Sequence, residues 1–138
     1  MKKKQAFSLI ELILVVIIVL SLGVLSTAFY SRFLNQNSVS NVSDQLVSQL
    51  RKAQVYAMSG KQNSSWGVKY SSSTITLFSS SSSAFDETFN VNNITIGGFS
   101  QVVFAKTTGI PDSTPTITIS GGGNTQNVSV NSQGTVSR

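Results

Sequence analysis

The first hydrophobic feature of the chain is an uncharged run of 20 residues from Leu12 to Ser31. As an α-helix this run would extend about 30 Å, which matches the hydrocarbon thickness of a bilayer. β-Branched residues fill the stretch from Val15 to Val19, and they suit lipid or a packed helical bundle better than a water-exposed helix. The pattern predicts a helix that spans a membrane or packs in a filament.

A second pattern follows, in which small and aliphatic residues recur at intervals of three and four. This is the spacing of one buried stripe on an amphipathic helix. The stripe consists of Val39, Val42, Leu46, Leu50, Ala53 and Ala57. Gly60 supplies a stop signal just beyond it. We therefore predict one long helix from about Phe7 to about Ser59, hydrophobic within residues 7–38 and amphipathic within residues 39–60.

After Gly60 the chain consists of short β-rich pieces separated by Ser, Asn and Gly clusters. The pieces are Trp66–Tyr70, Thr74–Phe78, Phe85–Val91, Asn93–Ile96, Gln101–Phe104, Thr116–Ile119, Asn127–Val130 and Thr135–Ser137. Polar and apolar residues alternate in the later pieces, so one sheet face should be buried against the helix stripe. Sequential hairpins without an intervening helix predict an antiparallel sheet over residues 64–138 and an α+β fold.

The length and charge of the chain limit its organisation. With 138 residues, it has room for one small domain besides the hydrophobic helix. We divide it into a basic leader of residues 1–6, a hydrophobic helix of residues 7–38 and a globular head of residues 39–138. The formal net charge is +5, but three of the ten basic residues lie in the leader, which leaves seven against five acidic ones. The leader lysines predict a cytoplasmic N-terminus and a head outside.

Glu11 is the one carboxylate at the head of the apolar helix. Such a charge costs about 2.5–3.5 kcal/mol at the centre of a membrane span, so it calls for a partner. Cleavage between Ala6 and Phe7 would create an α-amino group four residues before Glu11. Residues at i and i+4 share a helix face, and a carboxylate in a first turn also meets the positive end of the helix dipole.

A basic leader, a small residue, Phe7 and then Glu11 resemble the class III signal of type IV pilins and type II secretion pseudopilins. The resemblance implies that a prepilin peptidase cleaves between Ala6 and Phe7 and methylates the amine of Phe7. It also implies that Glu11 serves assembly by pairing with the N-terminal amine of a neighbouring subunit. The family usually has Gly before the cleavage site, and Ala6 departs from that pattern.

The part of the chain after the helix resembles one group within this family. A Trp66-Gly67-Val68 strand after the helix, a Val103-Phe104 strand running into a glycine loop, and a final Gly134-Thr135-Val136 strand look like the GspH/FimT group of minor pilins and pseudopilins. The implied protein has a pilin-like fold and is a structural subunit of a type IV pilus or a type II secretion system. Its implied partners are other pilin subunits, the prepilin peptidase, the cytoplasmic membrane and the assembly platform.

Other interpretations of the N-terminus remain open. An ordinary secretory signal could be cleaved after Ala28, which would release a free β-rich protein. A plain membrane anchor with an incidental acid is a further alternative. The chain has no cysteine, which excludes a lipoprotein.

The composition argues against an enzyme. The chain has neither His nor Cys, so it lacks the usual nucleophile pairs and the commonest zinc ligands. Asp86 and Glu87 form the only acidic pair, and adjacent strand residues point to opposite faces. We predict solvated carboxylates there, with a calcium site as the minor alternative.

The glycine run Gly121–Gly123 predicts a hairpin connection between two strands. We expect no cofactor, no metal and no catalytic residue.

Nucleic acid is the rival partner, since some FimT-like minor pilins take part in DNA uptake. Phosphate binding needs clustered basic residues. The candidate contacts are Lys61, Lys69, Lys106 and Arg138, and solvated surface charge is the competing explanation.

Six aromatic residues could form a stacking surface, but we predict that they form the core. These are Trp66, Phe78, Phe85, Phe89, Phe99 and Phe104.

Overall fold

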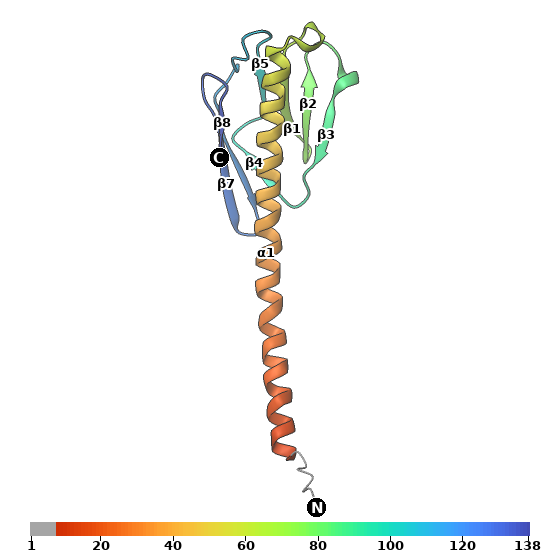
Figure 1. The fold of residues 1–138 in the computed structure, drawn as a ribbon, viewed down its shortest axis with the longest axis vertical. Helices are drawn as coiled ribbons and strands as arrows, with labels where there is room; N and C mark the ends of the chain where they lie inside the picture. Colours follow the sequence, from red (N-terminus) through yellow and green to blue (C-terminus); the bar gives the residue numbers. More distant parts are fainter. Residues whose placement is uncertain (1–7) are drawn as a thin grey trace, which may run out of the picture. The chain divides into compact units, whose positions relative to one another are not determined.

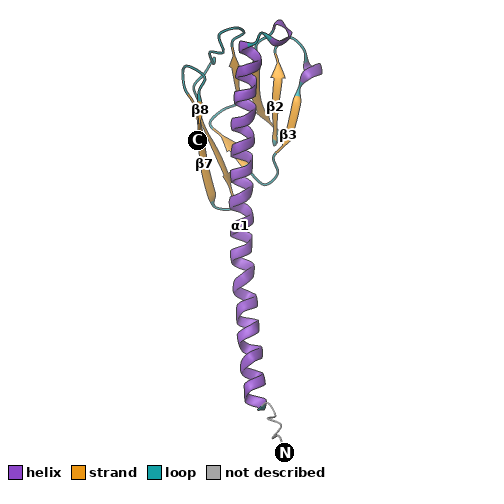
Figure 2. Cartoon of the chain, in the orientation of Figure 1, coloured by secondary structure: helices purple, strands orange, loops and turns teal. Residues whose placement is uncertain are grey.

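The computed structural model describes residues 8–138, apart from the side chains of residues 25–28. The chain has an α+β fold, in which one long helix, α1 (Leu9–Met58), precedes eight strands and two short 3-10 turns (Figure 1, Figure 2). It divides into two compact units, one ending at Leu34 and the other comprising Asn35–Arg138. From here on, the apolar segment is the unit that ends at Leu34, and the head is the unit Asn35–Arg138.

In the head, α1 buries the predicted stripe. All six stripe residues from Val39 to Ala57 are buried. The helix ends at Met58, where Gly60 adopts a left-handed conformation with φ of 63° and its N–H donates to the carbonyl of Ala57. The same carbonyl accepts a hydrogen bond from Thr107 N–H at 2.9 Å. The predicted stop at Gly60 is therefore confirmed, and a later loop also caps the helix end.

The first sheet holds four antiparallel strands in the order β3-β2-β1-β5. Their bounds are β1 (Trp66–Ser71), β2 (Thr74–Ser79), β3 (Glu87–Asn90) and β5 (Gln101–Phe104). Trp66 lies opposite Ser79 on one side and opposite Phe104 on the other. The turns η1 (Lys61–Asn63) and η2 (Ser83–Phe85) precede β1 and β3.

The second sheet holds four antiparallel strands in the order β4-β6-β7-β8. Their bounds are β4 (Thr95–Gly97), β6 (Thr116–Gly121), β7 (Asn124–Val130) and β8 (Val136–Ser137). The hairpin between β6 and β7 turns at Gly122 and Gly123, both with positive φ. This confirms the hairpin predicted for Gly121–Gly123.

The head contains two sheets, whereas the sequence pattern predicted one. The physical reason lies at the edge of β5, where a returning loop occupies the hydrogen-bonding groups of Val103. Asp112 Oδ1 accepts from Val103 N–H at 2.9 Å, and Asp112 N–H donates to the Val103 carbonyl at 2.9 Å. These bonds cover the outer edge of β5 at Val103, so the first sheet ends there, and β4, β6, β7 and β8 form the second sheet.

One hydrophobic core contains the α1 stripe together with buried residues of both sheets. The ribbon shows α1 lying against the strands of both sheets (Figure 1). Of the six aromatic residues predicted to be core, Trp66 and Phe104 are fully buried, and Phe89 and Phe99 pack against the core partly buried. The prediction is wrong for Phe85, which is 47% exposed because it lies in η2 and not in a strand. Phe78 is half-buried on β2, opposite Gly67.

Candidate functional site

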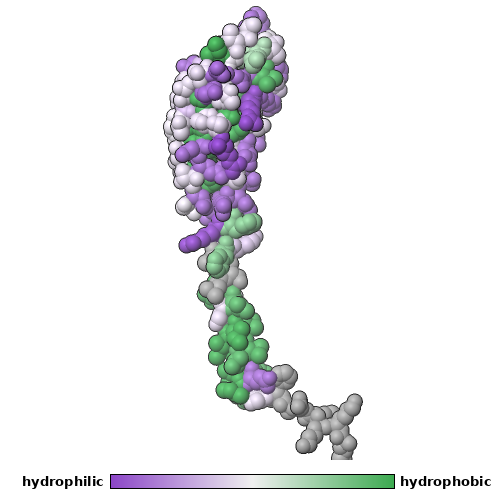
Figure 3. Space-filling view, turned by 60° about the vertical axis from the view of Figure 1, so that its left-hand side comes forward, coloured by the Kyte–Doolittle hydropathy of each residue, from purple (hydrophilic) through white to green (hydrophobic). Residues whose placement is uncertain are grey.

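The apolar segment exposes its hydrophobic side chains. Its large aliphatic and aromatic residues whose side chains are described, from Leu9 to Val24 and from Phe29 to Leu34, are all exposed (Figure 3). α1 is long and apolar enough, by length and composition, to cross a membrane. Contiguous exposed apolar surface of this extent indicates contact with lipid or with other protein. The predicted hydrophobic helix is therefore present as an exposed apolar helical surface among the described residues.

Several polar groups in this segment are hydrogen-bonded within the helix. The N–H groups of Glu11 and Leu12 donate to the carbonyl of Ser8 at 3.0 and 3.2 Å. The hydroxyl of Ser21 donates to the carbonyl of Ile17 at 2.8 Å. Because these bonds form within the helix, the groups that make them need no water in an apolar medium.

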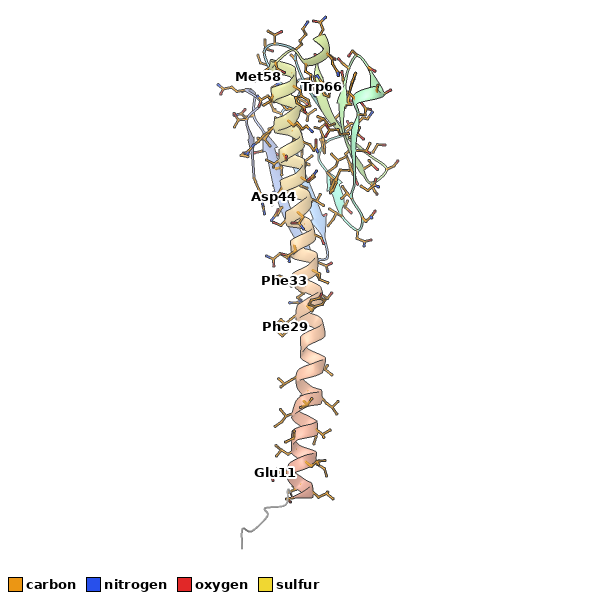
Figure 4. All side chains as sticks on the ribbon, turned by 45° about the vertical axis from the view of Figure 1, so that its right-hand side comes forward. Glu11, Phe29, Phe33, Asp44, Met58 and Trp66 are labelled. Atoms are coloured by element: carbon orange, nitrogen blue, oxygen red, sulfur yellow. The ribbon has the colours of Figure 1, made fainter. Side chains whose placement is uncertain are left out.

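Glu11 lies in the first turn of α1 and is exposed (Figure 4). The ion pairs among residues 8–138 do not include its carboxylate. Ala6 and Phe7, the predicted processing site, lie outside the described residues. Glu11 is thus a carboxylate at the start of an apolar helix without a cationic partner in the part of the chain that the structure describes.

Two of the four candidate basic residues lie near the C-terminal end of α1. Lys61 Nζ sits 3.5 Å from the ring centroid of Tyr56 and 5.3 Å from that of Trp66. The two rings meet edge to face at 4.9 Å, and the Trp66 indole N–H donates to the Lys61 carbonyl at 3.0 Å. Lys106 Nζ donates to Asn63 Oδ1 in the adjacent turn. Lys61 and Lys106 carry no carboxylate partner among the described residues.

The other two candidates each face a carboxylate. Lys69 Nζ lies 3.9 Å from Asp86 Oδ2 and 5.0 Å from the centroid of the Phe78 ring. Arg138 binds Asp44 Oδ1 and also donates to Ser40 Oγ at 2.8 Å. These partners offset the positive charge that would attract phosphate. The four residues therefore do not form one free basic stripe.

The structure also contains an ion pair that sequence reasoning missed. Lys52 on α1 donates to both carboxylate oxygens of Glu87 on β3, at 2.7 and 2.6 Å. This hydrogen-bonded carboxylate raises the pKa of Lys52, and partial burial opposes the rise. No local signal could reveal the pair, because its members are 35 residues apart and meet only through the packing of α1 on the sheet.

The two carboxylates of the acidic pair, Asp86 and Glu87, each contact a different lysine. Asp86 faces Lys69, whereas Glu87 binds Lys52. Within residues 8–138, no group of three or more acidic side chains is placed to hold a metal ion. The predicted solvated carboxylate is present at Glu87, whose side chain is 48% exposed, whereas the Asp86 side chain is 19% exposed and its Oδ1 is buried.

No protein-family model, curated protein sequence or solved structure matches the chain. The functional argument therefore depends on the residues and the fold themselves.

Proposed function

We propose that this chain is a non-enzymatic structural subunit, a minor pilin or pseudopilin of a type IV pilus or a type II secretion system. The observation that carries the proposal is Glu11, a carboxylate without a described partner at the start of an apolar helical segment. The precursor is held in the cytoplasmic membrane by this segment, with its N-terminus in the cytoplasm. The subunit then assembles through the same segment.

Processing supplies the partner that Glu11 lacks. Hydrolysis of the peptide bond between Ala6 and Phe7 by a prepilin peptidase leaves an α-amino group on Phe7. The same enzyme transfers to this amine a methyl group from a sulfonium methyl donor, which leaves as a thioether while the amine loses a proton. In the filament, the amine of one subunit pairs with Glu11 of its neighbour. Breaking a buried ion pair by removing one partner costs about 3–5 kcal/mol. A subunit docked in the wrong register would incur this cost, so the pair selects the correct axial position.

The head supports this role because it folds around its own core. Its buried residues come from α1 and both sheets, so the exposed helix of the apolar segment remains available for lipid or for other subunits. The Lys52–Glu87 pair joins α1 to β3, and the Asp44–Arg138 pair joins α1 to the last residue of the chain. A head with its own core, joined to an apolar helix, fits a subunit that moves from a membrane into a filament.

The experiment that tests processing is mass spectrometry of the N-terminus of the full chain, expressed with and without a prepilin peptidase. We expect the mature protein to begin at Phe7 and to carry one added methyl group only when the peptidase is present. An intact Met1, or a terminus created by cleavage after Ala28, would reject the proposal. The second outcome would favour a free secreted β-rich protein.

A further inference from the structure

The outer end of the apolar segment carries a cluster of amphipathic side chains. Phe29, Tyr30 and Phe33 are 71%, 64% and 60% exposed (Phe29 and Phe33 are labelled in Figure 4), and Arg32 is exposed among them. Successive helical residues are about 100° apart, so these four side chains cover roughly 160° of the helix circumference. We call Phe29, Tyr30, Arg32 and Phe33 the interfacial cluster.

We propose that the interfacial cluster binds the phospholipid headgroup layer on the outer side of the membrane and fixes the depth of the helix. This inference rests on the proposed function, in which the precursor is stored in a bilayer. Tyrosine places an apolar ring and a polar hydroxyl at such a boundary, and aromatic residues gather there in membrane proteins. The Arg32 guanidinium complements the phosphate charge of the headgroups.

The apolar run sets the depth of the helix only coarsely. No charge occurs between Glu11 and Arg32, so a small displacement exchanges one aliphatic side chain for another in the hydrocarbon, and only a larger one draws Glu11 or Arg32 into it. Within that range, tilt and depth are set by interfacial aromatic and basic anchors. The interfacial cluster is the one such group at the outer end of the run, within the described residues 8–34.

The position of the cluster also fixes where Glu11 lies. Glu11 precedes Phe29 by 18 residues and Phe33 by 22, which correspond to about 27 and 33 Å along a helix. The hydrocarbon layer is about 30 Å thick. When the cluster lies at the outer boundary, Glu11 therefore lies at the inner boundary. The cost of a charge falls steeply from the bilayer centre to the interface, so the stored precursor tolerates Glu11 without a partner.

The test measures depth along the helix of the full chain. Because the protein has no cysteine, single Ile10→Cys, Leu20→Cys and Ser31→Cys variants can each carry one spin label. The labelled protein is placed in phosphatidylcholine–phosphatidylglycerol vesicles, and label accessibility to oxygen and to a water-soluble nickel chelate is compared. We expect Leu20 to be deepest, with Ile10 and Ser31 at shallow and similar depths. A Ser31 label as deep as the Leu20 label would overturn the proposal.

A variant and its control identify the cause. Replacing Phe29, Tyr30 and Phe33 together by Leu retains the helix and its hydrophobicity but removes the interfacial rings. We expect the Ser31 label to move deeper by about one helical turn, roughly 5 Å, and the Ile10 label to move toward water. Replacing Ile13, Ile17 and Ile18 together by Leu should leave both depths unchanged.

Two outcomes would contradict the role of the cluster. Unchanged depths in the Phe29/Tyr30/Phe33 variant would show that it does not position the helix. Label depths that change when the protein is diluted in lipid would show that a second copy of the chain, and not the headgroups, contacts the interfacial cluster. If the chain is processed correctly at Phe7 and either result is found, only the depth-fixing role of the interfacial cluster is rejected. If the chain is not processed at Phe7, the proposed function is rejected.

Discussion

At the residue scale, the Lys52–Glu87 pair makes a pH-dependent contribution to the stability of the head. The pair is partly exposed, so we expect Lys52→Met to lower the free energy of unfolding by about 0.5 kcal/mol at neutral pH. Glu87 raises the pKa of Lys52 in the folded state. The contribution is therefore full below the ordinary lysine pKa of about 10.4 and is lost as the pH rises through the higher folded pKa.

Urea unfolding of the detergent-solubilised chain at pH 7 and pH 11.5 checks this prediction. The difference between wild type and Lys52→Met should shrink at the higher pH. Glu87→Gln is the matched control, because it removes the carboxylate that raises the pKa and should abolish the same pH dependence. An equal difference at both pH values would contradict the assigned cause.

Single residues were predictable from the sequence where the signal was local. Glu11 could be identified because a carboxylate interrupts an apolar pattern, and Gly60 because it follows the last stripe residue. The partners of Lys69 and Arg138 could not be predicted. Asp86 and Asp44 lie far from them in sequence, and Asp44 meets Arg138 only when the C-terminal residues return to α1.

At the element scale, the turn between β7 and β8 docks on α1 through Gln54. Gln54 Nε2 donates to the carbonyls of Gln133 at 3.0 Å and Gly109 at 3.3 Å. Gly134 has φ of 81°, and a Cβ there would lie 2.3 Å from Gln54 Nε2. The same Cβ would lie 2.8 Å from the Gly109 carbonyl oxygen. We expect Gly134→Ala to destabilise the head by about 2 kcal/mol, from left-handed strain of about 1 kcal/mol together with displacement of Gln54 and of the Gly109 carbonyl.

Gly123→Ala provides the comparison. Gly123 has a similar φ of 82°, but no atom within 4 Å would meet its Cβ. This variant should lose only the strain term of about 1 kcal/mol. Urea unfolding of both variants measures the difference, and equal losses would show that the contacts of Gly134 with Gln54 and Gly109 add nothing.

The elements themselves were largely predictable, but their pairing was not. Apolar periodicity predicted α1, and β-rich pieces between turn residues predicted strands close to those observed, including β1 and β6. Alternation specifies which face of a strand is buried and does not specify its neighbour. The first sheet ends at β5, whose edge Asp112 covers, and this contact between a loop and a strand carries no periodic signal.

At the scale of the whole molecule, the chain combines two parts with opposite relations to solvent. The head buries its apolar residues against one another, whereas the apolar segment exposes them. The proposed function assigns lipid to that segment before assembly and neighbouring subunits afterwards. Glu11 changes its surroundings in that transfer. Under this proposal it lies near headgroups in the stored precursor and becomes buried in the filament, where a neighbouring amine offsets its charge.

The most direct test of this central claim joins Glu11 to its partner chemically. Filaments assembled from isotopically labelled copies of this chain and unlabelled subunits are treated with a carbodiimide, which couples a carboxylate to an amine in contact with it. We expect a labelled peptide containing Glu11 bonded to the unlabelled N-terminal peptide of another subunit. Glu11→Gln, which keeps the shape but not the charge, should remove this product and reduce incorporation. Filaments that incorporate Glu11→Gln normally, or that yield no such mixed peptide, would contradict the proposed pairing.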